Sequence, residues 1–137
     1  MQPEILKQFV EDGGLVVRAS GDCMSGTFPD GAKLLLKRKS LYMAGDVIVY
    51  ARGDDTLVAH RLLGYLPGPS GWRVLTRADN AIKADHPAAI SRVLGCVVQQ
   101  DGVRLKYPLS TRLLAGLAYF PSVIGWLKQR RADQNPS

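Results

Sequence analysis

The chain has 137 residues, of which 46% are hydrophobic and 22% are charged, with 14 glycines and 8 prolines. This mixture excludes a disordered, collagen-like or coiled-coil chain, and the many helix breakers disfavour an all-helical bundle. The length is that of one domain with its own core. Most of the net charge of +6 lies in residues 102–137, which hold six basic groups and one acidic group, Asp133. A basic tail of this kind suits an anionic surface, either lipid headgroups or nucleic acid.

The first hundred residues alternate between short apolar runs and turn residues. Apolar spacing predicts a short amphipathic helix over residues 3–11, ended by Gly13 and Gly14. Seven short strands are predicted after it, at residues 15–19, 33–37, 47–51, 57–63, 72–76, 93–99 and 103–107. Residues 66–71 contain two prolines and two glycines and predict a loop, and residues 77–88 are irregular and polar. The pattern indicates a mainly β protein with a small antiparallel fold, closed or sandwich-like.

The last part of the chain is a different kind of segment. Residues 1–108 form the predicted β domain, and residues 109–137 form an amphipathic or interfacial helical tail that is both apolar and basic. Its uncharged run, residues 113–127, would cover about 22 Å as a helix, less than the roughly 30 Å of a bilayer core, and Pro121 is expected to interrupt it. Tyr119, Phe120 and Trp126 are residue types that favour a membrane interface. Two interpretations stay open: an interfacial membrane anchor over residues 109–131, or a helix that packs on the β domain or on a partner.

Several classes of protein are disfavoured by what the sequence lacks. The first twelve residues contain acidic side chains and no apolar run, so they do not resemble a signal peptide. No apolar stretch of the sequence is long enough for a membrane-spanning helix. We therefore expect a cytoplasmic or peripherally membrane-associated, prokaryotic-like protein. The two cysteines, Cys23 and Cys96, are too few for a disulfide scaffold and show no zinc-ligand spacing, so neither a metal nor a cofactor is predicted. Cys96 lies in a predicted strand and is expected in the core.

Three places could carry chemistry. Cys23 lies in a glycine-flanked loop after the first strand, where backbone N–H groups could bind an oxyanion; the alternative is an inert loop cysteine. His60 should share one strand face with Val58 and Leu62, which suits either a core histidine or a general base. Asp79 and Asp85 follow the fifth strand and are either functional carboxylates or ordinary turn formers.

Taken in order, five segments resemble the signal peptidase superfamily, which includes the LexA-type self-cleaving repressors. Residues 21–28, Gly-Asp-Cys-Met-Ser-Gly-Thr-Phe, resemble the nucleophile box Gly-x-Ser-Met-x-Pro-Thr-Leu. Residues 45–50 read Gly-Asp-Val-Ile-Val-Tyr, and residues 58–62 resemble the base box Val-Val-His-Arg-Val. Residues 75–80 resemble Leu-Thr-Lys-Gly-Asp-Asn, and residues 93–98 resemble Val-Leu-Gly-x-Val-Val. The ordered set lies within residues 15–107, about two thirds of the chain, and is specific although each box alone is weak.

The resemblance implies the small antiparallel β fold of signal peptidases and LexA C-terminal domains, with an active site. Bacterial signal peptidases and LexA-type proteins use a lysine base, whereas the archaeal and endoplasmic-reticulum branch uses histidine. His60 therefore places this chain nearest the histidine branch. In that branch the second aspartate after the Asp-Asn box completes the triad; Asp85 matches that position, and Asp79 matches the first and is a supporting residue.

Two residues depart from the family pattern: Cys23 replaces serine and Gly26 replaces proline. An imidazole can hold cysteine as a thiolate, so the implied site is Cys–His–Asp. Cys23 would attack the carbonyl with its backbone N–H in the oxyanion hole, His60 would move the proton, and Asp85 would orient His60. Ser25 is an alternative nucleophile, but it lies two positions after the place that the family's nucleophilic serine occupies in the box. An inactive relative remains the alternative, although the retained His60, Asp79 and Asp85 favour an active one.

The leading hypothesis is an endopeptidase that cleaves a leader, signal or precursor peptide after small residues, with the substrate added as a strand beside Gly21 and Met24. One alternative is a catalytically inactive peptide-binding module on the same fold. Another is a membrane-surface or nucleic-acid-binding protein that depends on the basic tail. Because only fourteen residues precede the first strand, no DNA-binding segment is expected, which disfavours a LexA-type repressor and a specific nucleic-acid partner.

Overall fold

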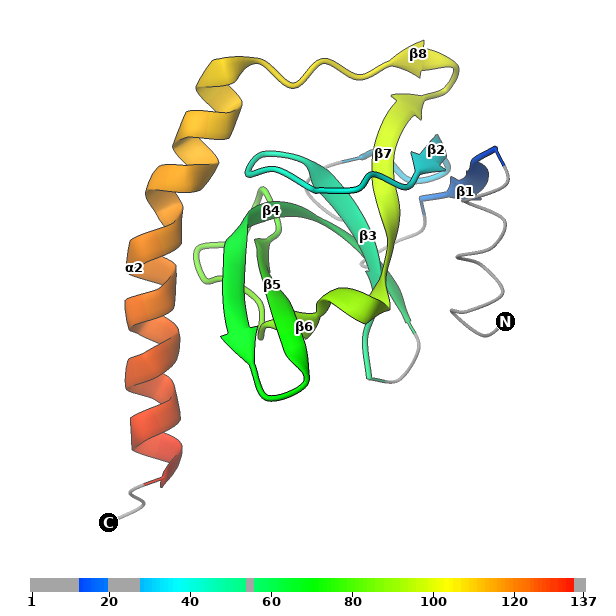
Figure 1. The fold of residues 1–137 in the computed structure, drawn as a ribbon. Helices are drawn as coiled ribbons and strands as arrows, with labels where there is room; N and C mark the ends of the chain where they lie inside the picture. The colour runs from blue at the N-terminus through cyan, green and yellow to red at the C-terminus, as the bar shows by residue number, and fades with distance from the viewer. Residues whose placement is uncertain (1–12, 20–27, 54–55, 135–137) are drawn as a thin grey trace.

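The protein is mainly β, with one curled antiparallel sheet and one C-terminal helix (Figure 1). The computed structural model describes residues 13–19, 28–53 and 56–134. The helix expected over residues 3–11 lies outside this part of the chain. So do Gly21, Cys23, Met24 and Ser25 of the predicted nucleophile loop.

Eight described strands form the sheet, in the spatial order β1-β2-β7-β3-β4-β5-β6 with β8 paired to β7, and every pairing is antiparallel. The strands are β1 (Leu15–Arg18), β2 (Lys33–Lys37), β3 (Val47–Ala51), β4 (Leu57–Gly68), β5 (Gly71–Arg77), β6 (Ala88–Ala89), β7 (Val93–Gln100) and β8 (Val103–Arg104). The 3-10 helix η2 (Ile90–Arg92) joins β6 to β7. The expectation of a small antiparallel β fold is confirmed.

The prediction of a loop over residues 66–71 is wrong. Strand β4 continues to Gly68 and β5 starts at Gly71, so the two strands form one long hairpin in which Pro67 pairs with Trp72. The buried side chain of Leu66 holds this end of β4 against the helix, and Gly71 takes a φ of 121° that suits a tight turn. Tertiary packing thus outweighs the local preference of proline and glycine for a loop. The last strand, in contrast, is shorter than the predicted residues 103–107 and ends at Arg104.

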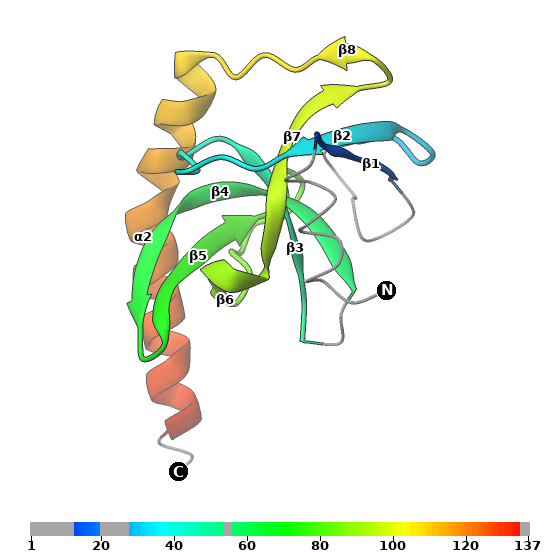
Figure 2. The same ribbon diagram turned by 45° about the vertical axis from the view of Figure 1, so that its right-hand side comes forward.

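Strand β3 is buried on both faces and lies between two core clusters. Val47 and Val49 face a cluster that also contains Leu34, Ala59 and Leu94. The other face of β3 belongs to a second cluster, whose buried members are Tyr42, Ile48, Tyr50, Val58, Leu62, Val74, Val93 and Cys96. Cys96 is fully buried, which confirms its predicted place in the core. Figure 2 shows how the sheet curls around this region.

The C-terminal tail is one continuous helix, α2 (Leu109–Gln134), and the expected interruption at Pro121 does not occur. Side chains on both sides of the proline pack on the same part of the sheet: Ala115 and Tyr119 before it, Val123 and Trp126 after it. Pro121 has no backbone N–H and so removes one helical hydrogen bond, but the packing on both sides of it keeps the helix continuous. One of the two interpretations of the tail, a helix packed on the β domain, is therefore observed. In the part of the chain that the structure describes, no helix has an apolar stretch long enough to cross a bilayer.

Two close contacts fasten α2 to the sheet. Asp46 is fully buried and accepts hydrogen bonds from Arg112 of α2 (Nη1 to Oδ1, 2.9 Å) and from the backbone N–H of Met43 (2.9 Å). Further along, the Tyr119 ring lies over Gly64 of β4, and the Tyr119 hydroxyl donates to the carbonyl of Tyr65. The Asp46–Arg112 ion pair and the close approach of Tyr119 to Gly64 together determine the position of α2 on the sheet.

The contact at Gly64 predicts a specific loss of stability. A Cβ at this position would lie 2.6 Å from Cδ2 of Tyr119, so Gly64→Ala should push α2 away from β4. We expect the free energy of unfolding, measured by urea titration, to fall by about 1–3 kcal/mol. Gly116→Ala is the matched control, because a Cβ on that α2 residue meets nothing within 4 Å and alanine favours the helix. Equal stability of Gly64→Ala and the wild type would contradict this account of the packing.

Candidate active site

A histidine and an aspartate that are 25 positions apart in the sequence meet on one face of the sheet. His60 lies in β4 opposite Ile48 of β3 and is only 4% exposed. Its Nδ1 is 2.5 Å from Oδ2 of Asp85, which lies in the segment after β5. The backbone N–H of Asp85 donates to the Thr76 carbonyl (2.8 Å) and so positions this segment beside β5. His60 shares its strand face with Val58 and Leu62, as the alternation predicts.

Two hydroxyl groups hold the Asp85 carboxylate in place. The same Oδ2 that contacts His60 accepts hydrogen bonds from Thr76 Oγ1 (2.8 Å) and from the Tyr50 hydroxyl (3.3 Å). The hydroxyl oxygens of Tyr50 and Thr76 are 3.1 Å apart, and the Tyr50 ring lies edge-on to His60 with centroids 6.4 Å apart. The carboxylate thus has a defined position, and so does the imidazole bonded to it.

The surroundings favour an ionised aspartate and a neutral tyrosine. Burial alone would raise the Asp85 pKa, but the hydrogen bond and charge of His60, with the two hydroxyls, outweigh it and hold that pKa below its ordinary value. Burial and the nearby Asp85 charge raise the pKa of Tyr50 to about 12. Tyr50 therefore acts as a hydrogen-bond donor to the carboxylate and not as a second anion.

This arrangement has the form of a general base. With Nδ1 bonded to a carboxylate, the imidazole keeps one tautomer, and Nε2 is the atom that can take and return a proton. The carboxylate also stabilises the imidazolium that forms when the proton is taken. Among the described residues, no cluster of three His, Cys, Asp or Glu side chains could hold a metal ion.

Asp79 has a different role from Asp85. Its two carboxylate oxygens each accept a 2.8 Å hydrogen bond from the Arg61 guanidinium, which also donates to the Gly45 carbonyl (2.8 Å). The hydrogen bonds that Arg61 donates to Asp79 raise the pKa of Arg61, so the guanidinium stays charged. Asp79 therefore joins the segment after β5 to β4 next to His60, and its supporting role in the site stays a prediction.

Sequence analysis missed two residues of this network, Tyr50 and Thr76. Both lie inside segments that resemble the family boxes, residues 45–50 and 75–80, so their positions were visible but their role was not. The signal was the strand pairing: Tyr50 pairs with Val58, and Thr76 pairs with Leu62, the two residues that flank His60 on its face. Directly paired residues in antiparallel strands point to the same face, which brings both hydroxyls to His60.

The ends of the segment that carries Cys23 are packed firmly. Ala19 donates from its N–H to the Ala32 carbonyl (2.8 Å), and both Ala19 and Phe28 are buried in the cluster that contains Ala59. Ala59 precedes His60 in β4, and its side chain points to the opposite face of the strand. Cys23, the predicted nucleophile, and Gly21, Met24 and Ser25 beside it lie outside the described residues.

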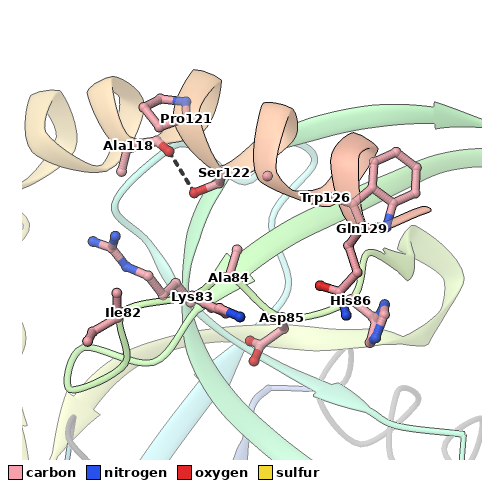
Figure 3. Close-up of a pocket in the computed structure, with 12 residues that line it drawn as sticks. Ile82, Lys83, Ala84, Asp85, His86, Ala118, Pro121, Ser122, Trp126 and Gln129 are labelled. Atoms are coloured by element: carbon pink, nitrogen blue, oxygen red, sulfur yellow. Dashed lines mark hydrogen bonds between the residues drawn. The ribbon is translucent and has the colours of Figure 1, made fainter. Parts of the chain in front are cut away.

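A cavity of about 590 Å³ lies between α2 and residues 82–86, the segment that carries Asp85 (Figure 3). Its polar wall includes Arg77, Lys83 and His86 from the sheet side and Ser122 and Gln129 from α2. The Asp85 carboxylate points away from the helix, whereas His86 lies below Gln129 (Figure 3). Asp85 both lines this cavity and contacts His60 through Oδ2.

Comparisons with known proteins give no relative from which to assign a function. No protein-family model matches the chain, and a search of curated proteins finds no match. The fold and the geometry around His60 are therefore the basis for the proposal below.

The low pKa of Asp85 predicts a pH-dependent stability. A group whose pKa is depressed in the folded state stabilises the fold above its ordinary pKa, 3.8 here, and this stabilisation is lost as the pH falls through the folded value. We expect Asp85→Asn to lower the free energy of unfolding at pH 7 by about 1–3 kcal/mol, because hydrogen bonds to a charged group are lost.

The measurement is urea unfolding of both proteins between pH 7 and pH 3. The difference between them should shrink toward acid pH, because the unfolded wild-type chain binds a proton at Asp85 below about pH 3.8 while the folded chain does so only at lower pH, and the variant has no carboxylate to titrate. A constant difference across this range would show that the charge of Asp85 contributes nothing to stability.

Proposed function

We propose that the protein is a thiol endopeptidase, similar to signal peptidases, that cleaves a leader, signal or precursor peptide with Cys23, His60 and Asp85. The observation that carries the proposal is the 2.5 Å contact between His60 Nδ1 and Asp85 Oδ2, held by Tyr50 and Thr76. These two residues have the positions that the family resemblance assigns to the base and the orienting carboxylate.

The hydrogen bonds around the Asp85 carboxylate support a catalytic role over a purely structural one. One oxygen of Asp85 accepts three hydrogen bonds, and its pKa stays low despite burial. A core histidine needs only one partner to satisfy its N–H, and a backbone carbonyl would serve. An ionised carboxylate at Nδ1 is the partner that holds the tautomer in which Nε2 can take a proton, and it stabilises the imidazolium.

The reaction follows from these assignments. His60 Nε2 takes the proton of the Cys23 thiol, and the thiolate attacks the carbonyl carbon of the scissile peptide bond. The backbone N–H of Cys23 helps to bind the resulting oxyanion. The C–N bond breaks as His60 returns the proton to the leaving amine, which leaves a thioester. A water molecule then gives a proton to His60, attacks the thioester and releases the acid, and the thiol regains its proton.

The reactivity of Cys23 provides the first test. Iodoacetamide alkylation is measured against pH in a Cys96→Ala background, although Cys96 itself should react slowly because burial raises its pKa to about 11. We expect Cys23 to titrate well below the ordinary thiol value of about 8.5, and to return to that value in the His60→Ala variant. His86→Ala, at the exposed second histidine of the chain, is the matched control and should leave the profile unchanged. The same profile with and without His60 would exclude a working Cys–His pair.

Cleavage is the second test, with a library of precursor peptides that carry small residues at varied positions. Cys23→Ala and His60→Ala should abolish cleavage, Cys23→Ser should retain some, and Asp85→Asn should lower kcat by about 10²–10⁴-fold. Peptides that bind the wild type but are never cleaved would instead favour the inactive peptide-binding module. Unchanged cleavage by the alanine variants would overturn the proposed site.

A further inference from the structure

The outward face of α2 is an apolar stripe that the fold leaves uncovered. Its members are spaced by three or four residues, which places them on one side of the helix. They are Leu109, Leu113, Leu117, Phe120, Ile124 and Leu127, and each is between 44% and 72% exposed. Leu114, 68% exposed, lies at the edge of the same face. Soluble monomers seldom expose an apolar surface this long and continuous.

Packing of α2 on the domain does not require this stripe. Ala115, Tyr119 and Trp126, which contact the sheet, lie on the opposite side of the helix. Figures 1 and 2 show α2 along one side of the sheet, with no other described element on its outer side. The helix therefore has two apolar faces, of which the fold uses one.

The charges around the stripe have a single sign. No acidic residue occurs between Asp101 and Asp133. Lys128 and Arg131 follow the last apolar residue of the stripe and are exposed. Arg130 lies over the Trp126 ring, with its guanidinium carbon 5.6 Å from the centroid, whereas Arg112 is engaged by the buried Asp46.

We propose that this stripe binds the surface of an anionic lipid bilayer, with α2 lying in the plane of the interface. An exposed apolar helix face with cations at one end is the pattern of interfacial helices, and the cations match anionic headgroups. A second copy of the chain fits less well. Two such helices would bring their cations together, and their stripes offer no acidic residue for an ion pair. Helices that pair with one another commonly form such ion pairs.

Docking of this kind would place the candidate active site near the membrane. Asp85 lines the cavity on the inner side of α2, so a bilayer on the outer side would lie about one helix diameter, roughly 10–12 Å, from that cavity. This consequence depends on the proposed function, but binding of lipid by the stripe does not.

The test is flotation of the full chain with two kinds of vesicle, phosphatidylcholine alone and phosphatidylcholine mixed with phosphatidylglycerol. We expect the wild type to bind the anionic vesicles more strongly, and Leu117→Glu with Phe120→Glu to reduce that binding at least about tenfold. Lys128→Glu with Arg131→Glu should weaken binding to the anionic vesicles only. Val103→Glu, on the 70% exposed residue of β8, is the matched control and should bind as the wild type does.

Three results would overturn the proposal. One is a wild type that binds neither vesicle, and another is equal binding by the Leu117→Glu, Phe120→Glu variant. The third is a concentration-dependent dimer, seen by light scattering, that this variant abolishes, because the stripe would then be covered by a second copy. Circular dichroism of the variants checks that α2 remains folded. Alkylation of Cys23 without vesicles tests the proposed function separately.

Discussion

The register shift in β4 is the constraint on which the rest of the structure depends. Opposite β5, Leu62 pairs with Thr76 but Gly64 pairs with Leu75, so Leu63 is an extra residue in the strand. An inserted residue reverses the alternation of side chains between the two faces. Before it, His60 and Leu62 face the second core cluster; the inserted Leu63 and, beyond it, Leu66 face α2. One strand thereby supplies both the candidate base and the surface on which the C-terminal helix packs.

A fully buried carboxylate, Asp46, and a partly buried one, Asp85, hold this arrangement together in different ways. Asp46 joins the turn before β3 to α2 through Arg112, and Asp85 joins the segment after β5 to His60. Each has several hydrogen-bond donors, which is what a carboxylate removed from water requires. Asp46 is paired with lysine and arginine cations, whereas Asp85 faces a histidine. Lysine and arginine keep their protons in such a pair, whereas an imidazole can take and return one, and this difference separates the structural carboxylate from the candidate catalytic one.

Helix α2 connects the two proposals. Its inner face contacts the sheet and the segment around Ala84, next to Asp85, while its outer face carries the apolar stripe. A peptidase that acts on leader or signal peptides meets substrates whose apolar parts are near membranes. A helix that binds lipid on one side and lies beside the site on the other would bring enzyme and substrate to the same surface.

Much of the strand pattern could be predicted from the sequence because it depends on local alternation. The positions of β2 and β3, the face shared by Val58, His60 and Leu62, and the burial of Cys96 all follow from period-two patterns and turn residues. The pairing of His60 with Asp85, and not with Asp79, was expected from the resemblance to a family, since nothing in the local sequence separates the two aspartates. The structure shows the contact between His60 and Asp85, and it pairs Asp79 with Arg61.

Tertiary structure decided what local preferences could not. Prolines and glycines near residue 68 predict a loop, and Pro121 predicts a broken helix. Both β4 and α2 nevertheless continue through these residues, because side chains of β4 and side chains of α2 are buried against each other. The hydroxyls of Tyr50 and Thr76 reach Asp85 only through pairings between distant strands. The apolar residues of the tail were visible in the sequence, but which of them face the sheet and which stay exposed depended on where Asp46 and Gly64 hold the helix. Local sequence sets the preference of each segment, and contacts between distant segments determine which preferences are kept.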